Sequence, residues 1–289
     1  NNIDDAVIWI PLGNLSSTLT AGYCGIFDGN QHHVSNMRVG TLSGDNGLRK
    51  GFIGVLGDDA SRKAGIIKDF GVKSGKVTGL SYTAGIAAVV QGTGSKVQRC
   101  WNGAEISGIS PVGGIIALMG SSSVPQMNQV VEGCYNLGTL TMSGTAGGPC
   151  IGGIAGVVFA GSGGQVIRNS YNQGRVTGPV GDNINIGGLV GVFYGTKMEN
   201  CYNSGIVSSG YGIAAKAYSG RVKNCYYEKS AAGIISEEIP DAANAGVMYG
   251  VTVSQLKSWS AAYALNGYGL ESDSEECSWT WTTGGVPTL

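Results

Sequence analysis

Hydrophobic and polar positions alternate over short stretches of this chain, and the alternation returns along most of its length. Lys197–Tyr202 is typical: the apolar Met198 precedes the polar Glu199, and the Asn200–Cys201 step then interrupts the pattern. A period of two residues indicates strands. The stretches are too short and too evenly spaced for strands that alternate with helices, and no amphipathic helical stripe appears before about Ser254.

Two motifs recur along the chain in a fixed order. The first is rich in glycine and reads Ile-Gly-Gly-Ile-Ala-Gly-Val over 151–157. Further copies of the first motif begin at 50, 83, 112, 186 and 211. The second motif follows and consists of Cys or Ser, an aromatic residue and usually Asn, at intervals of about 24 to 36 residues. A repeat of this length is typical of solenoids, in which each coil packs on its neighbours.

In a β-solenoid, each repeat position becomes a column along the axis, with about 4.8 Å between coils. We expect an inward column of small side chains at Cys100, Cys134, Ser170, Cys201 and Cys225. We expect a ladder of stacked amides at Asn102, Asn136, Asn172 and Asn203. We expect an aromatic column on the opposite side of the strand at Trp101, Tyr135, Tyr171, Tyr202 and Tyr226.

The chain is therefore predicted to be all-β: a right-handed, single-stranded parallel β-helix (β-solenoid) with a small C-terminal capping helix and strand. It is expected to form a single domain over 1–289. Residues 1–50 would form the N-terminal cap and first coil, 51–230 the repeats and 231–289 the C-terminal cap. In that last segment Ser254 is the candidate N-cap of the helix. The apolar face of this helix would hold Leu256, Trp259, Ala262 and Tyr263.

The composition of the chain limits the classes of partner that it could bind. The chain has 51 glycines and only 13% charged residues, yet 42% of it is hydrophobic. Ordinary soluble domains carry about 7% glycine and about 25% charged residues, so tight turns between short strands are expected. With a net charge of −1 and no basic stripe, we expect no nucleic acid partner. The apolar stretch 151–160 is too short for a bilayer span of about 20 residues, so we expect no membrane insertion.

Candidate chemistry is sparse. The repeat column that contains Asp69 holds no second carboxylate, whereas glycoside hydrolysis normally takes two. His32 and His33 are adjacent and would face opposite sides of a strand. The spacings of the seven cysteines favour buried packing over zinc. We therefore expect no enzyme activity, no catalytic residue, no cofactor and no metal.

The aromatic column is the one candidate binding feature, and two interpretations of it stay open. If the rings from Trp101 to Tyr226 are exposed, they form an apolar strip that could stack against sugars. Alternatively, the rings only hold adjacent coils together.

The motifs resemble the GLUG repeat. The resemblance rests on Ile-Gly-Gly-Leu-Val-Gly over 186–191 and on the Asn-Cys-Tyr-Asn segments with their following Gly. The stretch Gly25–Val34 is similar to the start of such proteins, and 284–289 is similar to their end. Such repeats accompany immunoglobulin-A-cleaving metallopeptidases and adhesin-like surface proteins of bacteria, often gut species.

The resemblance implies a non-catalytic, structural or adhesive module of a bacterial surface protein, located outside the cell or on its surface. The partners would be host or bacterial surface glycans or proteins. The chain begins at Asn1 without Met or a signal peptide, so a monomeric module of a larger chain is expected. The alternative is a carbohydrate-binding module or a degenerate polysaccharide-processing β-helix.

Overall fold

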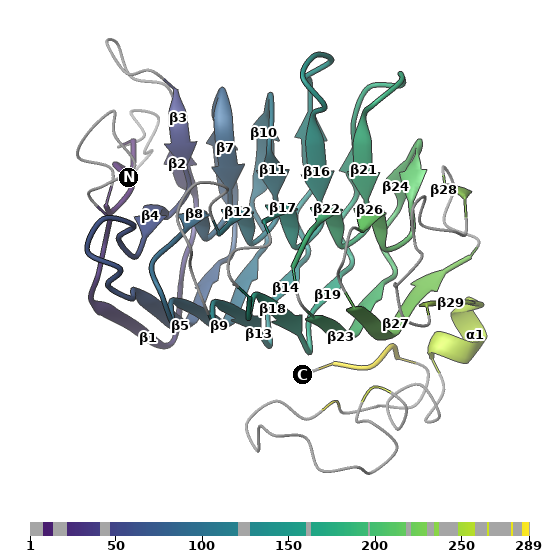
Figure 1. The fold of residues 1–289 in the computed structure, drawn as a ribbon. Coiled ribbons are helices and arrows are strands. Elements are labelled where there is room, and N and C mark those ends of the chain that lie inside the picture. Colours follow the sequence, from purple (N-terminus) through teal and green to yellow (C-terminus); the bar gives the residue numbers. More distant parts are fainter. Residues whose placement is uncertain are drawn as a thin grey trace.

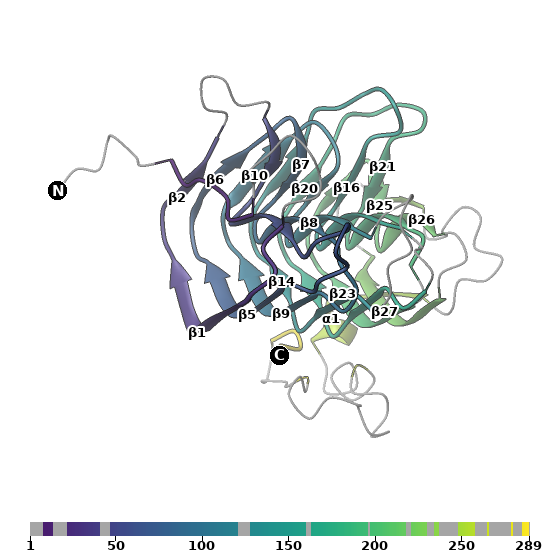
Figure 2. The same cartoon turned by 60° about the vertical axis from the view of Figure 1, so that its left-hand side comes forward.

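The computed structural model describes residues 8–13, 22–40, 47–120, 128–159, 163–195, 197–217, 221–229, 234–236, 248–257, 265, 279 and 285–288. Its parallel strands stack into four sheets (Figure 1), which confirms the predicted parallel β-helix. The sheets are numbered 1 to 4 in the order in which the chain enters them. Each complete coil passes through all four before the next coil begins. The view in Figure 2 shows the coils lying in step along the axis.

Sheet 1 carries the second motif and extends over all described coils. Its strands are β1 (Ile26–Val34), β5 (Ile66–Val72), β9 (Lys96–Asn102), β13 (Val130–Glu132), β14 (Tyr135–Asn136), β18 (Val166–Arg168), β19 (Tyr171–Asn172), β23 (Lys197–Asn203), β27 (Arg221–Glu228) and β29 (Met248–Val251). Neighbouring coils pair in register, as Cys201 opposite Cys225 and Tyr202 opposite Tyr226 illustrate. Equivalent repeat positions therefore do form columns.

Sheets 2, 3 and 4 complete the coil. Sheet 2 consists of β2 (Met37–Val39), β6 (Gly75–Thr78), β10 (Glu105–Gly108), β15 (Leu140–Met142), β20 (Val176–Thr177) and β24 (Val207–Ser208). Sheet 3 consists of β3 (Leu48–Lys50), β7 (Ser81–Ala84), β11 (Val112–Gly113), β16 (Cys150–Gly152), β21 (Asn185–Gly187), β25 (Gly210–Tyr211) and β28 (Ile234–Ser236). Sheet 4 consists of β4 (Ile53–Leu56), β8 (Ala87–Val90), β12 (Ile116–Met119), β17 (Ala155–Val158), β22 (Val190–Phe193) and β26 (Ala214–Ala217).

A left-handed residue bends each coil in sheet 1 and explains the interrupted alternation. The residue before the Cys-or-Ser position has a φ between 48° and 63° in every copy: Asp69, Arg99, Gly133, Asn169, Asn200 and Asn224. Such a residue shifts the inward and outward alternation of the following side chains by one position, as a β-bulge does. Met198 and Cys201 consequently both point into the core, although three positions separate them.

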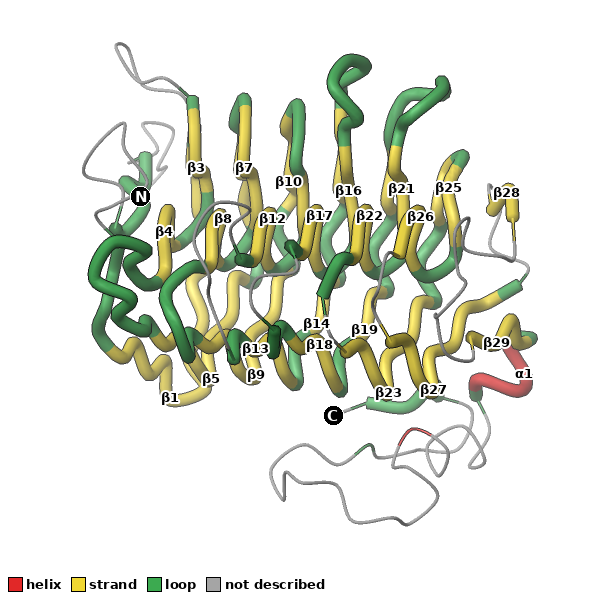
Figure 3. Tube along the Cα trace, viewed as in Figure 1, coloured by secondary structure: helices red, strands yellow, loops and turns green. Residues whose placement is uncertain are grey.

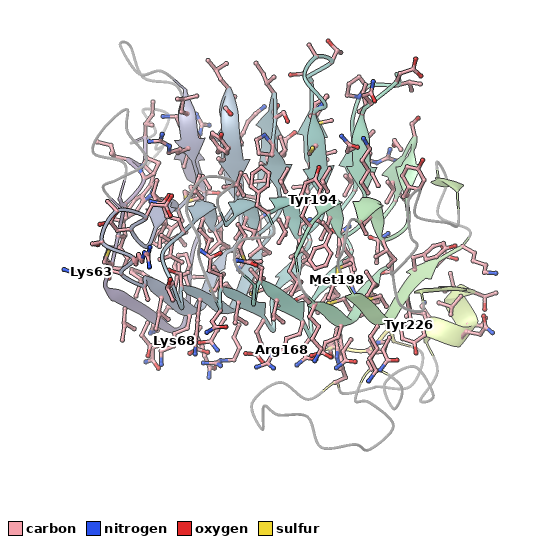
Figure 4. All side chains as sticks on the ribbon, viewed as in Figure 1. Lys63, Lys68, Arg168, Tyr194, Met198 and Tyr226 are labelled. Atoms are coloured by element: carbon pink, nitrogen blue, oxygen red, sulfur yellow. The ribbon has the colours of Figure 1, made fainter. Side chains whose placement is uncertain are left out.

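The interior of the solenoid is apolar. Fully buried aliphatic residues stack along sheet 1 as Ile67, Val97, Val131, Ile167, Met198 and Val222. Figure 4 shows Met198 on the inner side of this sheet, with Lys68 and Arg168 on its outer side. Alternate positions of one strand therefore separate the core from a polar outer face.

The helix near the C-terminus begins earlier than predicted. It is α1 (Val253–Leu256), and Figure 3 shows it beside the end of sheet 1. The N-cap is Thr252, whereas Ser254 was expected, because Thr252 and Gln255 form a reciprocal capping box that satisfies two backbone N–H groups. Leu256 is buried as expected. The predicted contacts of Trp259, Ala262 and Tyr263 lie outside the described residues. Within the ranges given above, no helix is long and apolar enough to cross a membrane.

Candidate functional site on the outer face of sheet 1

The predicted asparagine ladder is confirmed. Asn102, Asn136, Asn172 and Asn203 are all fully buried. The Nδ2 atoms of the first three donate to Oδ1 of the next asparagine at 2.8 Å. In each case Nδ2 also donates to the backbone carbonyl two residues further on, and Oδ1 accepts from the backbone N–H of that same residue. The ladder ends where Val72 and Tyr227 occupy the same repeat position.

The glycine-rich motif makes room for this ladder. A Cβ atom on the second glycine of each motif would overlap the facing asparagine. The pairs are Gly85 with Asn102, Gly114 with Asn136, Gly153 with Asn172 and Gly188 with Asn203. The two motifs recur together because one provides the space that the other fills.

The small column points inward, as predicted. Cys100, Cys134, Ser170, Cys201 and Cys225 are fully buried, and their four thiols are free. Each side chain donates to the backbone carbonyl two residues earlier, for example the Sγ of Cys201 to Glu199 O at 3.1 Å. Burial raises the pKa of the Cys100 and Cys201 thiols, so these groups stay protonated and poorly nucleophilic. The described residues contain no group of three or more His, Cys, Asp or Glu arranged to hold a metal ion.

Two polar columns flank the aromatic rings, and the sequence reasoning overlooked the first of them. The first alternates in charge apart from the neutral Gln98: Asp28, Lys68, Gln98, Glu132, Arg168, Glu199 and Lys223. Within it, Lys68 binds Asp28 at 3.0 Å and Arg168 binds Glu132 at 2.8 Å. The second is the left-handed column, where Arg99 makes a bidentate pair with Asp69. Aligning residues two positions before the Cys position would have revealed the first column, whereas the second is the repeat column of Asp69 that the sequence had already indicated.

The aromatic column forms on the outer side of sheet 1. Trp101, Tyr135, Tyr171 and Tyr202 stack with ring planes within 3° of parallel and centroids 4.9 to 5.9 Å apart. Trp101 lies over Gly71, where any Cβ would overlap the indole, and its centroid is 5.9 Å from that of His33. The column is therefore continuous from His33 to the later tyrosines.

An apolar binding strip needs exposed rings, and this column is exposed only at one end. Trp101 and Tyr135 are half-buried, but the exposed fractions of Tyr171, Tyr202 and Tyr226 are 5%, 0% and 8%. Leu256, Leu265 and Trp279 cover these three tyrosines. Figure 1 shows the last described residues, in yellow, below sheet 1 near β23 and β27. Tyr171, Tyr202 and Tyr226 are thus corrected to buried residues.

Ring orientation limits what the open end can do. Parallel stacking places each ring face against its neighbour, so the rings present their edges and polar tips to solvent. A sugar stacks on a ring face, whereas rings stacked between coils contribute cohesion. The geometry favours the cohesive interpretation, and ligand binding by Trp101 and Tyr135 stays a prediction.

Comparison with known proteins places the fold. No model of a known family matches the chain, and no curated protein matches its sequence. A solved structure described as a putative immunoglobulin A1 protease from Bacteroides ovatus matches with a TM-score of 0.61 at 19% identity. The match covers 91% of this chain and 76% of that one. At this identity the likeness shows a shared fold, and the GLUG resemblance remains an interpretation of the motifs.

The same comparison corrects one expectation. The prediction that the chain is not an enzyme rested on the missing carboxylate pairs in the repeat columns. The neighbour with this fold is described as a protease, and that description contradicts the prediction. A repeat column without paired carboxylates is therefore no sufficient ground to deny enzyme activity.

Proposed function

We propose that this chain is a stiff extracellular module of a bacterial surface or secreted protein, which spaces or displays other parts of that protein and adheres to surfaces. The asparagine ladder carries this proposal. It ties four consecutive coils together through buried hydrogen bonds at 2.8 Å, and buried polar networks with every member satisfied rigidify a fold.

Single-molecule pulling along the solenoid axis tests the stiffness. The coils that carry the ladder should resist force as one unit and yield at a lower force in Asn136→Ala. Val180→Ala is the matched control, because Val180 is 81% exposed and its removal should leave the force unchanged. Coils that peel off singly at low force in the unaltered chain would contradict the proposal.

A second candidate function follows from the description of the solved neighbour. We propose immunoglobulin A1 as the first host glycoprotein to test as a partner or substrate, because the neighbour is described as a protease of that protein. Immobilised immunoglobulin A1 would be exposed to the chain, with binding followed by interferometry and cleavage by mass spectrometry. The absence of both binding and cleavage at micromolar chain concentrations would dismiss this candidate.

A further inference from the structure

The covered and uncovered halves of the aromatic column are one surface. Tyr135 is half-buried and Tyr171 is buried, yet their rings are parallel to within 2° with centroids 4.9 Å apart. Nothing in the strand geometry changes between them, since Tyr135 pairs in register with Tyr171. The difference lies only in what packs on top.

The cover on the buried half shows which chemistry this surface accepts. Trp279 lies tilted against Tyr171 and Tyr202, with centroids 5.8 and 5.4 Å away and planes inclined by about 50°. The Tyr202 hydroxyl donates to the backbone carbonyl of Pro287 at 2.7 Å. The bound segment thus contributes one tilted indole and one backbone acceptor to the edges of the stacked rings. This pattern needs an aromatic peptide and no access to a ring face.

The uncovered half offers the same groups. Trp101 and Tyr135 are partly exposed, and among the described residues nothing hydrogen-bonds the Tyr135 hydroxyl. The ion pair between Arg99 and Asp69 and the Gln98–Glu132 hydrogen bond border these rings with polar groups. An apolar centre with a polar rim is the usual anatomy of a peptide or protein contact.

We propose that Trp101 and Tyr135 form a docking site for an extended peptide segment of a partner protein that carries an aromatic side chain. The segment would extend the contacts that Trp279 and Pro287 already make on the adjoining rings. A glycan is the less favoured occupant, because the parallel stacking covers the faces on which sugars pack. The site does not depend on the stiffness proposed above, so the two can fail separately.

The probe is a fluorescent peptide with the sequence of residues 279–289, Trp-Thr-Trp-Thr-Thr-Gly-Gly-Val-Pro-Thr-Leu, titrated with the full chain by anisotropy. We expect saturable binding that weakens at least tenfold when Trp101→Ala and Tyr135→Ala are combined. The control is Phe159→Ala with Tyr194→Ala, since these rings stack within 2° at 6.0 Å directly after strands β17 and β22 of sheet 4. The control should bind normally.

If the double variant unfolds, Tyr135→Phe replaces it in the test, because this substitution keeps the ring and removes only the hydroxyl. We expect it to weaken peptide binding several-fold. The site is wrong if the unaltered chain does not bind the peptide. It is equally wrong if binding persists in the Trp101 and Tyr135 variants, which would mean exchange with the chain's own segment or attachment elsewhere. Glycan-array binding that these variants abolish, without peptide binding, would overturn the choice of occupant.

Discussion

A Cβ atom on Gly114 would lie 2.5 Å from Cγ of Asn136, so the two repeated motifs meet at a single point in the coil. The coil before the ladder has one residue fewer in its glycine-rich motif, because Lys50 pairs with Thr83 and Ile53 with Ala87. There, Phe52 lies in the shortened motif and Val72 at the asparagine position. Both residues belong to the apolar core. Glycine and an amide therefore close this corner within the ladder, whereas other pairs close it beyond the ladder, such as Gly212 with Tyr227.

Gly114→Ala should destabilise the protein. The new methyl group meets the Asn136 side chain and the backbone carbonyl of Gly153, and overpacking a filled interior costs about 1–3 kcal/mol. Urea denaturation should show the loss in the free energy of unfolding. Gly40→Ala is the control, because a Cβ there meets nothing within 4 Å, and its unfolding curve should match the unaltered chain.

Asn136→Ala should cost more stability than Asn203→Ala. Asn136 accepts from Asn102 and donates to Asn172, so its loss removes two buried hydrogen bonds between coils. Asn203 ends the ladder, and its loss removes only the one between coils that Asn172 donates. Each bond lost in a buried setting costs about 1–3 kcal/mol. Equal unfolding free energies for the two variants would show that the ladder is not the cooperative element.

The repeat columns could be read from the sequence because spacing alone places equivalent residues above one another. Inward cysteines, stacked asparagines and outward rings all follow from that alignment. The left-handed column could be aligned, and Gly and Asn, which favour that conformation, occupy four of its six positions. The conformation at the other two could not be foreseen. Arg99 and Asp69 adopt it with φ values of 49° and 52°, although such residues rarely do, and their bidentate ion pair accompanies the strain.

The covered tyrosines could not be predicted from the repeat. Tyr202 and Pro287 are 85 residues apart, and the contact is made once, so no periodicity signals it. The repeat fixes the side of the strand on which Tyr171 and Tyr202 lie. Whether that side meets water depends on a segment outside the repeat, which is why the sequence left both an exposed strip and a cohesive column open.

Thiol chemistry should separate the cysteines by burial. Cys24 is exposed, whereas Cys100, Cys134, Cys201 and Cys225 are buried, so a disulfide reagent should label Cys24 well before the four core thiols. Mass spectrometry after proteolysis identifies the labelled positions, and Cys24→Ser should remove the fast labelling at that position. Rapid labelling of the core thiols in the folded chain would contradict their inward placement.

Stability should fall at alkaline pH. Burial raises the pKa of Cys150 from 9.0 to about 11 and raises that of Cys100 and Cys201 as well. A raised folded-state pKa means that the stabilisation is complete below the unfolded value and is lost as pH rises through the folded value. The free energy of unfolding should therefore decrease from about pH 9 upward, and the decrease should be smaller in Cys150→Ser. A flat profile between pH 8 and 11 would contradict this linkage.

Tyr202→Phe should loosen the C-terminal segment while leaving the coils intact. The substitution keeps the stacked ring and removes a hydroxyl that donates to Pro287 O at 2.7 Å and accepts from Gln173 Nε2 at 3.1 Å. Both partners then lose a bond in a buried setting, which costs about 1–3 kcal/mol. Because Pro287 has no other tie to the rings among the described contacts, the loss should appear as faster hydrogen exchange at 285–288.

Tyr171→Phe is the matched control, since no described residue hydrogen-bonds its hydroxyl and its ring stacks equally well. Exchange accelerated over residues 96–136 as well would mean that the hydroxyl supports the whole solenoid, whereas unchanged exchange would mean that Trp279 alone holds the segment.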